Sequence, residues 1–484
     1  MASELLTALG VVLVLMLASW AAIVWHYRHT IRRAWREPVL RHPVLVIESD
    51  DWSPGPPEHA ERLQCIAARL GRRRDSTGRP AVMTLGLILT APDGRAAREH
   101  PDAVPTIALD DPSAEPILKA IRGGIARRVF APQLHGLAHY WPETLQQALK
   151  AAPRGSGLRP RRRAECVMQG PNQTADVAHG SAVLTEESPR ERASHSGEGA
   201  ANSAGASACG SGTAAANSLL HWLTAEDYPQ TEALPPHLQT RWADTTTLPS
   251  RPLARAAIKA AAQEEVATYA RILGTPPKVA VPPTFVWTRE VEETWINAGV
   301  EAIITPDRRY TARDANGQPA APEGPIGNGQ PAAGSALYLV RDIYFEPGRG
   351  HTADAALAAV RRRFTLGRPA LLETHRANFT GDEATFQRSL AELDRLLDWA
   401  GAALPDVRFM SCQELAAAYR RRDPTLVDRH AAARLRVTLR RLSGHGRLRK
   451  LAWATGLALP AMAAAWLLRV PETTMATNEV EGRA

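Results

Sequence analysis

The chain has 484 residues, a formal net charge of +8 and four cysteines. Much of the positive charge lies beside two apolar segments and is not interleaved with aromatic residues, so it does not indicate nucleic acid as a partner. The cysteines lack paired metal-ligand spacing, and two of them fall in a segment of low complexity, which argues against a disulfide framework. This cysteine usage favours a reducing compartment.

Residues 5–25 form an apolar stretch of about 21 residues without a charge, long enough to cross the hydrocarbon core of a membrane. Trp20 and Trp25 suit a membrane interface. A cleaved signal peptide is the competing interpretation, but no positive residue precedes the apolar stretch, and its length is that of a full span. We therefore predict that residues 1–27 are a transmembrane anchor.

A short apolar run at residues 44–47 leads to two adjacent carboxylates, Asp50 and Asp51. The run predicts a buried strand whose end carries the acidic pair, the position where barrel enzymes keep their catalytic groups. Adjacent acids repel each other unless a cation or a shared proton relieves them, so the pair is common in metal sites. A solvated turn is the alternative, because the next residues are rich in proline and glycine.

Another apolar approach, residues 128–131, leads to His135 and His139. Two histidines four residues apart can direct their imidazoles at one point, as metal ligation requires. Such a pair is often a surface feature or a satisfied core pair. Its order after the acidic pair favours a facial site of two histidines and one carboxylate.

Residues 151–215 contain almost no large apolar side chain. A segment of this composition buries too little surface to offset its ordering entropy, so we predict a disordered insertion. A smaller run rich in glycine and proline, residues 315–334, predicts a second surface loop.

Two later segments also carry candidate site residues. Residues 279–285 include Pro282 and Pro283, which hold a loop extended, and residues 370–375 end in His375. Together with the acidic pair and the histidine pair, these segments resemble the motifs of the polysaccharide deacetylases of the NodB-homology type, which are metal-dependent carbohydrate esterases.

The resemblance implies a role for each matching residue. Asp50 would be the general base and His375 the general acid. The metal ligands would be Asp51, His135 and His139. The implied cofactor is a divalent metal ion, zinc first, with cobalt, nickel or manganese as alternatives.

The chain departs from the family pattern at Val281, where the family has an arginine that pairs with the catalytic aspartate. Lys278, Arg289 or Arg376 could reach instead. Asp342 lies where the family keeps an acid that orients the last histidine, so we expect it beside His375.

The implied reaction is hydrolysis of an acyl amide or ester on a carbohydrate, with an N-acetyl group as the first expectation. A backbone N–H near Pro283 would stabilise the oxyanion. The aromatic residues beside the site loops suit either stacking on sugar rings or ordinary packing. They are Trp52, Tyr140, Trp141 and Trp287.

Two other functions stay open. A glycoside-processing enzyme on a related barrel could use two carboxylates, such as Asp50 and Glu373, without a metal. A membrane-tethered carbohydrate-binding protein with degenerate catalysis would explain the missing arginine at position 281.

Eight apolar runs can each form a strand: residues 44–47, 81–89, 129–132, 279–282, 302–305, 336–340, 370–374 and 407–410. Residues 253–273 and 386–400 carry apolar residues at helical spacing, as crossovers between parallel strands require. The fold class is therefore α/β, and the resemblance makes it a distorted (β/α) barrel. The catalytic domain is predicted to cover residues 43–420.

Residues 425–450 form a basic segment before a second apolar stretch, residues 451–469, which Pro460 interrupts. We predict a second transmembrane segment there, with a hairpin or a surface-lying helix as alternatives. A first basic cluster, Arg28, Arg32, Arg33 and Arg36, follows the first apolar stretch. Because this cluster and residues 425–450 both face the catalytic domain, the positive-inside rule puts that domain on the cytoplasmic side of the cell (inner) membrane and both tails outside. A lipid-linked sugar then competes with a polymer as the substrate.

Overall fold

The computed structural model describes residues 2–100, 103–150, 212–404 and 406–467. Its centre is one sheet of nine parallel strands in the order β10-β7-β6-β5-β2-β1-β12-β11, with β13 also paired to β1. The strands are β1 (Val44–Trp52), β2 (Met83–Leu87), β5 (Phe130–Leu134), β6 (Val279–Ala280), β7 (Ala302–Thr305), β10 (Leu337–Val340), β11 (Ile343–Tyr344), β12 (Ala370–His375) and β13 (Arg408–Phe409).

The two ends of this strand order are neighbours in the chain. Only Arg341 and Asp342 separate β10 from β11. Three steps between α-carbons span about 11 Å at most, so the sheet must curl until its two edges approach each other. The α/β class and the distorted (β/α) barrel are thus confirmed, with a short stretch of chain bridging the seam.

Each of the eight apolar runs overlaps one strand of the sheet, but two details differ from expectation. β1 continues through Trp52, so the acidic pair belongs to the strand itself and not to the loop after it. Residues 315–334 are not a plain surface loop, because β9 (Pro319–Glu323) lies within them and pairs antiparallel with β8 (Arg309–Arg313).

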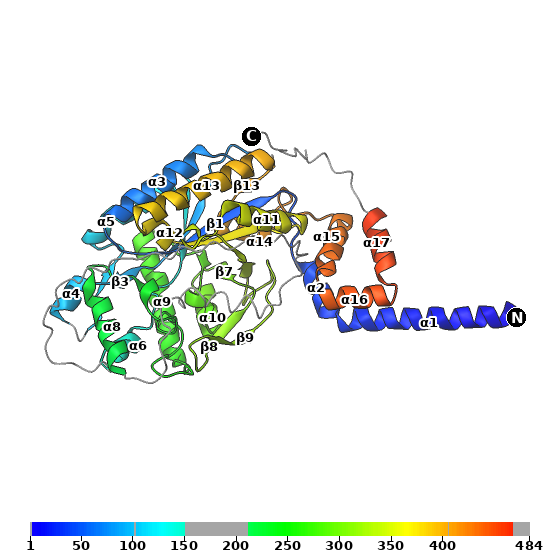
Figure 1. The fold of residues 1–484 in the computed structure, drawn as a ribbon, viewed down its shortest axis with the longest axis horizontal. Coiled ribbons are helices and arrows are strands. Elements are labelled where there is room, and N and C mark those ends of the chain that lie inside the picture. The colour runs from blue at the N-terminus through cyan, green and yellow to red at the C-terminus, as the bar shows by residue number, and fades with distance from the viewer. Residues whose placement is uncertain (1, 101–102, 151–211, 405, 468–484) are drawn as a thin grey trace, which may run out of the picture.

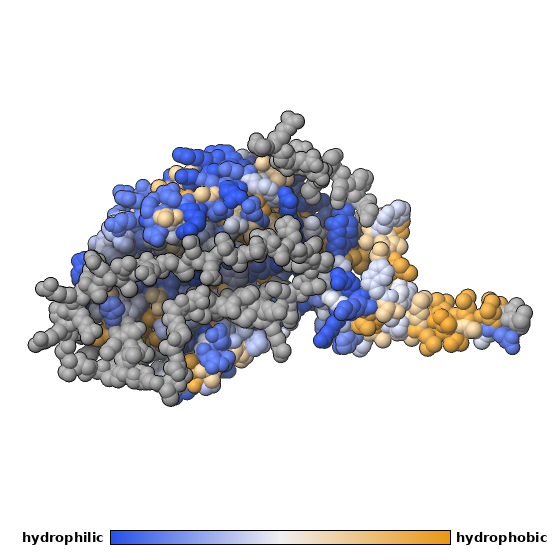
Figure 2. Space-filling view, in the orientation of Figure 1, coloured by the Kyte–Doolittle hydropathy of each residue, from blue (hydrophilic) through white to orange (hydrophobic). Residues whose placement is uncertain are grey.

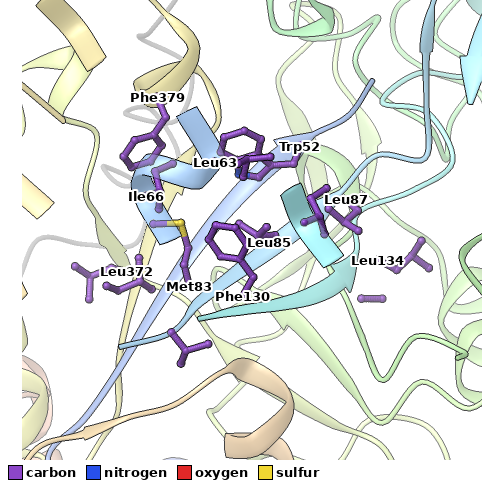
Figure 3. Close-up of a cluster of buried hydrophobic side chains, with 14 of the residues drawn as sticks. Trp52, Leu63, Ile66, Met83, Leu85, Leu87, Phe130, Leu134, Leu372 and Phe379 are labelled. Carbon is purple, nitrogen blue, oxygen red and sulfur yellow. The ribbon is translucent and has the colours of Figure 1, made fainter. Parts of the chain in front are cut away.

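Helices cover the outside of the curled sheet (Figure 1). They are α3 (Glu58–Arg72), α5 (Glu115–Ala126), α9 (Arg255–Leu273), α10 (Arg289–Asn297), α11 (Ala353–Thr365) and α13 (Glu383–Ala403). α14 (Cys412–Arg421) instead contributes Cys412, Leu415 and Tyr419 to a second core. The predicted helical stretches 253–273 and 386–400 correspond to α9 and α13. Side chains of both layers form the outer core: Figure 3 shows Leu63 and Ile66 of α3 near Met83 and Leu85 of β2 and Phe130 of β5.

A second, smaller core fills the inside of the barrel. Val44 and Val46 of β1 belong to it, together with Leu337 and Leu339 of β10. Because side chains alternate between the two faces of a strand, the next inward positions fall at residues 48 and 50 on β1 and at residue 341 after β10. These positions carry charged residues. The lumen is therefore apolar toward the amino ends of the strands and charged toward their carboxyl ends.

Smaller elements surround one rim of the barrel. They are β3 (Thr90–Pro92), α4 (Gly94–Glu99), β4 (Thr106–Ala108), α6 (Pro142–Lys150), α8 (Gly212–Ala225) and α12 (Ala377–Thr380). The predicted insertion, residues 151–215, lies outside the described residues except for its last four, which begin α8.

The chain ends carry helices apart from the barrel: α1 (Ala2–His26), α2 (Arg28–Arg36), α15 (Ala431–Ser443), α16 (Gly446–Ala454) and α17 (Ala458–Leu467). α1 projects from the domain and is apolar on its visible surface (Figures 1 and 2). Among the described residues it is the one helix long and apolar enough to cross a membrane.

The predicted second span does not form a single helix in the described residues. The chain turns at Gly456, which has a φ of 75°, and this turn separates α16 from α17. α17 has ten residues, about half of the length that a crossing needs.

Candidate metal and hydrolytic site

Three of the predicted ligands converge at the carboxyl ends of β1 and β5. The Nε2 atoms of His135 and His139 lie 3.2 Å and 3.6 Å from Oδ1 of Asp51. One ligand atom from each residue lies within 4.8 Å of those of the other two, and all three residues are buried. Among the described residues, Asp51, His135 and His139 are the one group of three or more histidine, cysteine or carboxylate side chains close enough together to hold a metal ion.

A bulge in β1 lets neighbouring residues serve one site. Consecutive side chains of a regular strand point to opposite faces, but the register of β1 with β2 shifts between Ser49 and Trp52. Asp51 has a φ of 70°, in the left-handed region that side chains rarely adopt, and this changes the direction of its carboxylate. Gly86 of β2 makes room for the other acid, since a Cβ there would collide with Oδ1 of Asp50.

The histidines are held by their backbone surroundings. Nδ1 of His135 lies 3.0 Å from the carbonyl oxygen of Val281. With the proton on Nδ1 and donated to that carbonyl, Nε2 offers its lone pair toward Asp51, the tautomer that a metal ligand needs. Gly136, between the two histidines, has a φ of 112°, which suits glycine and turns the chain sharply after β5.

The charges of the three groups fit a divalent cation. Oδ1 of Asp51 is buried and accepts no hydrogen bond from the described residues. Burial alone would raise the pKa of Asp51, but His135, His139 and His375 together outweigh burial and lower it. Burial also lowers the pKa of His139 to about 4, so His139 is neutral at pH 7 and free to act as a ligand.

Asp50 has the cationic partner that position 281 does not supply. Nη1 of Arg341 lies 2.6 Å from Oδ2 of Asp50. Burial alone would raise the pKa of Asp50, but Arg341, assisted by His135 and His375, outweighs it, and the pKa is lowered. Arg341, from the seam of the barrel, thus supplies the cation beside Asp50 that the family pattern places at position 281.

The three arginine and lysine side chains considered from the sequence pair elsewhere. Lys278 contacts Glu301 at 3.0 Å and Arg289 contacts Glu293 at 2.8 Å. Arg376 contacts the carboxylate of Glu232 at 2.8 Å. None of these three side chains is therefore the partner of Asp50, and another cation, Arg341, takes that place.

Arg341 also binds two further buried carboxylates. Its Nη1 lies 3.5 Å from Oε2 of Glu48, and its Nη2 lies 3.1 Å from Oε1 of Glu373. The amide of Gln133 donates to Oε2 of Glu48 at 3.1 Å. Burial raises the pKa of Glu48 to about 7, although Arg341 opposes that rise, and burial also raises the pKa of Glu373. One guanidinium cannot neutralise three anions, so Asp50, the nearest, is the one held ionised.

His375 ends β12 and is paired with Glu346. Nδ1 of His375 lies 2.5 Å from Oε1 of Glu346, and the amide of Asn378 donates to the other oxygen of the same carboxylate. Burial alone would lower the pKa of His375, but Glu346 outweighs it and raises the pKa to about 10. The imidazole is therefore protonated at neutral pH.

The acid expected to orient His375 was misplaced by four residues. Asp342 pairs with Arg363 of α11, while Glu346 contacts the histidine. Asp342 follows Arg341, and neighbouring residues of an extended chain point to opposite sides. With Arg341 turned into the lumen, Asp342 faces the outer helices.

The loop within residues 279–285 has a strained backbone beside Arg341 and its carboxylates. Thr284 and Phe285 have φ values of 52° and 56°, in the left-handed region. The ring of Phe285 lies 5.1 Å from the guanidinium of Arg341. Pro283 has no N–H, so Thr284 carries the backbone donor expected in this loop.

The aromatic residues that the sequence placed at the site are mostly core residues. Trp52, Tyr140 and Trp287 are at most 1% exposed, so none of them offers a ring to a substrate. Trp141 is 9% exposed and packs in the outer core. Tyr344 of β11, missed in the sequence, is 39% exposed and lies opposite Glu373 in the sheet register.

No family model matches the chain, and no curated protein matches it. Among solved structures it is similar to a family 4 carbohydrate esterase from Streptomyces lividans in complex with acetate, with 10% identity, a TM-score of 0.29 and coverage of 75% of this chain and 90% of that one. A protein from Mycobacterium smegmatis described as a polysaccharide deacetylase shows 11% identity, a TM-score of 0.32 and coverage of 80% and 96%.

A third structure, the 4-alpha-glucanotransferase from Thermococcus litoralis, shows 9% identity, a TM-score of 0.33 and coverage of 78% of this chain and 40% of that one. Two of these three proteins carry names from the class that the sequence motifs resemble. At such identities and TM-scores, we base the function on the geometry of the site.

Proposed function

We propose that this chain is a metal-dependent hydrolase that removes an acyl group, first of all an N-acetyl group, from a carbohydrate. The observation that carries the proposal is the convergence of Asp51, His135 and His139 within 4.8 Å, between the ionised Asp50 and the protonated His375. Five groups of these types at the carboxyl ends of barrel strands are what acyl transfer to water requires.

Asp51, His135 and His139 would hold the metal. A bound divalent ion supplies Lewis acidity, which polarises an acyl carbonyl and acidifies water. Zinc is our first choice because two imidazoles and one carboxylate form a common catalytic zinc set, and cobalt, nickel and manganese are the alternatives.

Asp50 would act as the general base. Its Oδ2 is held by Arg341, while its Oδ1 is buried and accepts no hydrogen bond from the described residues. A buried carboxylate with one free oxygen can take a proton from an attacking water. Arg341 keeps Asp50 ionised before the reaction and fixes its orientation.

His375 would act as the general acid. Glu346 fixes the ring through Nδ1 and keeps it charged, so Nε2 can donate a proton to the departing amine or alcohol. The N–H of Thr284 is the candidate donor to the oxyanion that develops on the acyl group.

Tyr344 and Phe285 are candidates for contacts with the sugar ring, because both are partly exposed and border the Arg341 cluster. We further propose that α1 anchors the enzyme in a membrane. The substrate would then be a polymer reached from the membrane or a lipid-linked sugar.

One observation favours a second candidate. Nη1 of Arg341 binds Asp50 and its Nη2 binds Glu373, and the two carboxyl groups have pKa values shifted in opposite directions. A glycoside-processing enzyme needs such a pair, with one acid and one base. This alternative leaves Asp51 and the two histidines without a role. The binding-only alternative loses its main support, because Arg341 supplies the cation that position 281 lacks.

The test is release of acetate from N-acetylated oligosaccharides, O-acetylated oligosaccharides and N-acetylated lipid-linked sugars, each with and without a chelator. We expect release that stops on chelation and returns when zinc, cobalt, nickel or manganese is added. Cleavage of glycosidic bonds that ignores the chelator would favour the two-carboxylate enzyme. Sugar binding without either reaction would favour the binding protein.

A further inference from the structure

α17 presents an apolar surface that the described residues leave uncovered. Its ten residues include no charged side chain, and Leu459, Met462, Trp466 and Leu467 are between 54% and 73% exposed. Exposing such a surface to water costs free energy, so it indicates a partner. The question is what covers it.

The direction of α17 relative to α1 narrows the choice. In Figure 1, α16 runs alongside the end of α1, and α17 then lies crosswise to α1. If α1 follows the membrane normal, α17 lies in the plane of the bilayer. An apolar helix in that plane, which at ten residues is too short to cross the hydrocarbon core, can bury its exposed apolar side chains below the headgroups.

A hydrogen bond fixes the depth of α17 along α1. The indole N–H of Trp20 donates to the carbonyl oxygen of Thr455 at 2.8 Å, just before α17 begins. Trp20 lies six residues before His26, the last residue of α1, which is about 9 Å along a helix axis. Interfacial helices sit about 5–10 Å into the boundary between headgroups and acyl chains. The 23 residues from Glu4 to His26 extend about 34 Å, which matches the hydrocarbon core.

Basic side chains on α16 and α2 lie on the barrel side of α17. Arg447, Arg449 and Lys450 are exposed on α16, before the turn to α17, and Arg32 and Arg36 are exposed on α2. Basic side chains next to an apolar helix suit anionic headgroups, which attract them electrostatically. The charge and the apolar surface therefore favour the same partner.

We propose that α17 lies in the interface of an anionic lipid bilayer and that α1 crosses this bilayer. The chain then touches the membrane at two points and remains, through Leu467, on the side of the barrel. This arrangement replaces the second transmembrane segment expected from the sequence. It rests on the proposed anchoring by α1 and is independent of the reaction at the metal site.

The two membrane contacts are firmly joined to the barrel. The buried guanidinium of Arg441 on α15 donates to the carbonyl oxygens of Ala34 and Glu37 at the end of α2 and to that of Leu366 after α11. Glu37 also pairs with Arg368, which precedes β12. The bilayer contact therefore sets the height and tilt of the barrel above the membrane.

The test uses the full chain in nanodiscs of phosphatidylcholine and phosphatidylglycerol, one chain per disc, with Cys65, Cys166 and Cys209 replaced by serine. Nitroxides are attached to the variants Met462→Cys on α17, Leu13→Cys on α1 and Arg388→Cys on α13. Depth is read from the relative accessibility to oxygen and to a water-soluble nickel complex. We expect position 462 about 5–10 Å below the phosphates, position 13 near the bilayer centre and position 388 in water.

The outcomes distinguish the interfacial position of α17 from the anchoring by α1. If position 13 is deep while position 462 is in water, the interfacial helix is wrong and the anchor stands. If position 462 is as deep as position 13, α17 belongs to a span. Water-like readings at both positions overturn the anchoring itself. Replacing Arg447, Arg449 and Lys450 with glutamate should move position 462 outward in anionic discs only, and an unchanged depth would contradict the role of the charges.

Discussion

At the carboxyl ends of the strands, Glu48, Asp50 and Arg341 are at most 2% exposed, whereas Leu459 and Met462 of α17 are 62% and 54% exposed. Charged side chains are thus buried in one region and apolar side chains are exposed in the other. Both regions reverse the usual distribution. Each reversal is tolerable only with a partner, a cation in the first case and lipid in the second.

The two regions differ in how much of the partner the chain supplies itself. In the lumen, Arg341 provides one positive charge for three carboxylates, and a metal would provide the balance for Asp51. On α17, no described side chain covers the exposed apolar residues. Metal binding in the lumen should therefore depend on single residues. Lipid binding by α17 should depend on the apolar area that it buries and on several basic side chains.

The largest effect is expected from removing a ligand. His135→Ala should abolish tight metal binding and lower kcat by on the order of 10³-fold, because the Lewis acid and its position are both lost. Metal content and acetate release measure this. His100→Ala, an exposed histidine outside the site, is the matched control and should change neither quantity. Full activity of His135→Ala would separate the reaction from the metal.

Arg341→Met should destabilise the fold strongly. It leaves Asp50 and Glu373 buried without their cation, which costs about 3–5 kcal/mol. The control Arg420→Met removes a partly exposed pair with Glu301 and should cost about 0–1 kcal/mol. Thermal unfolding of the full chain in detergent compares them. Equal losses would show that the lumen charges are not coupled through Arg341.

The sequence predicted which residues cluster at the candidate site better than it predicted their partners. Asp50, Asp51, His135, His139 and His375 stand at the ends of apolar runs, and parallel strands bring such ends together. Arg341 and Glu346 have no comparable signal, because Arg341 lies between β10 and β11 and Glu346 follows the two-residue strand β11. Arg341 and its neighbour Asp342 point to opposite sides of the chain, so a shift of one residue in the expected pattern exchanges their roles.

The burial of Trp52 depends on a β-bulge, which the local sequence pattern does not predict. The bulge at Asp51 changes which way the residues after it point, and Trp52 ends in the core, where its indole N–H donates to Ser49 at 2.9 Å. The eight apolar runs made the α/β class predictable, and the family resemblance made the barrel predictable. The break between α16 and α17 was not, because composition alone makes residues 451–469 look like a marginal span.

Glu346→Gln should change the pH dependence of the reaction. Because Glu346 raises the pKa of His375 to about 10, its loss should lower that pKa and shift the basic limb of the activity profile to lower pH, with a loss of about 10- to 100-fold at pH 8. The protonated His375 also contributes stability below about pH 6.5, and this contribution is lost as pH rises through about 10. The variant should show a flatter stability profile in that window.

Asp342→Asn is the matched control for Glu346→Gln. Its carboxylate pairs with Arg363, so it should leave the basic limb in place. A shift produced by Asp342→Asn and not by Glu346→Gln would restore the assignment made from the sequence and contradict the observed pairing.

The smallest effect on activity is expected from Glu48→Gln, within about threefold at pH 6, where an amide resembles the protonated acid. Glu48 has a pKa raised to about 7, so in the native protein it binds a proton that the unfolded chain releases near pH 4.5. The native stability should therefore fall as pH rises from about 4.5 to 7, and Glu48→Gln should remove that slope. Chemical unfolding at several pH values measures it; an unchanged slope would mean that Glu48 is not the group responsible.

The most direct test of the central claim is the metal content of the purified full chain, measured together with calorimetric titration of the chelated protein with zinc and cobalt. We predict one tightly bound divalent ion per chain, lost in His135→Ala and retained in His100→Ala. A chain that binds no divalent ion, or that binds one equally well without His135, would contradict the proposed site.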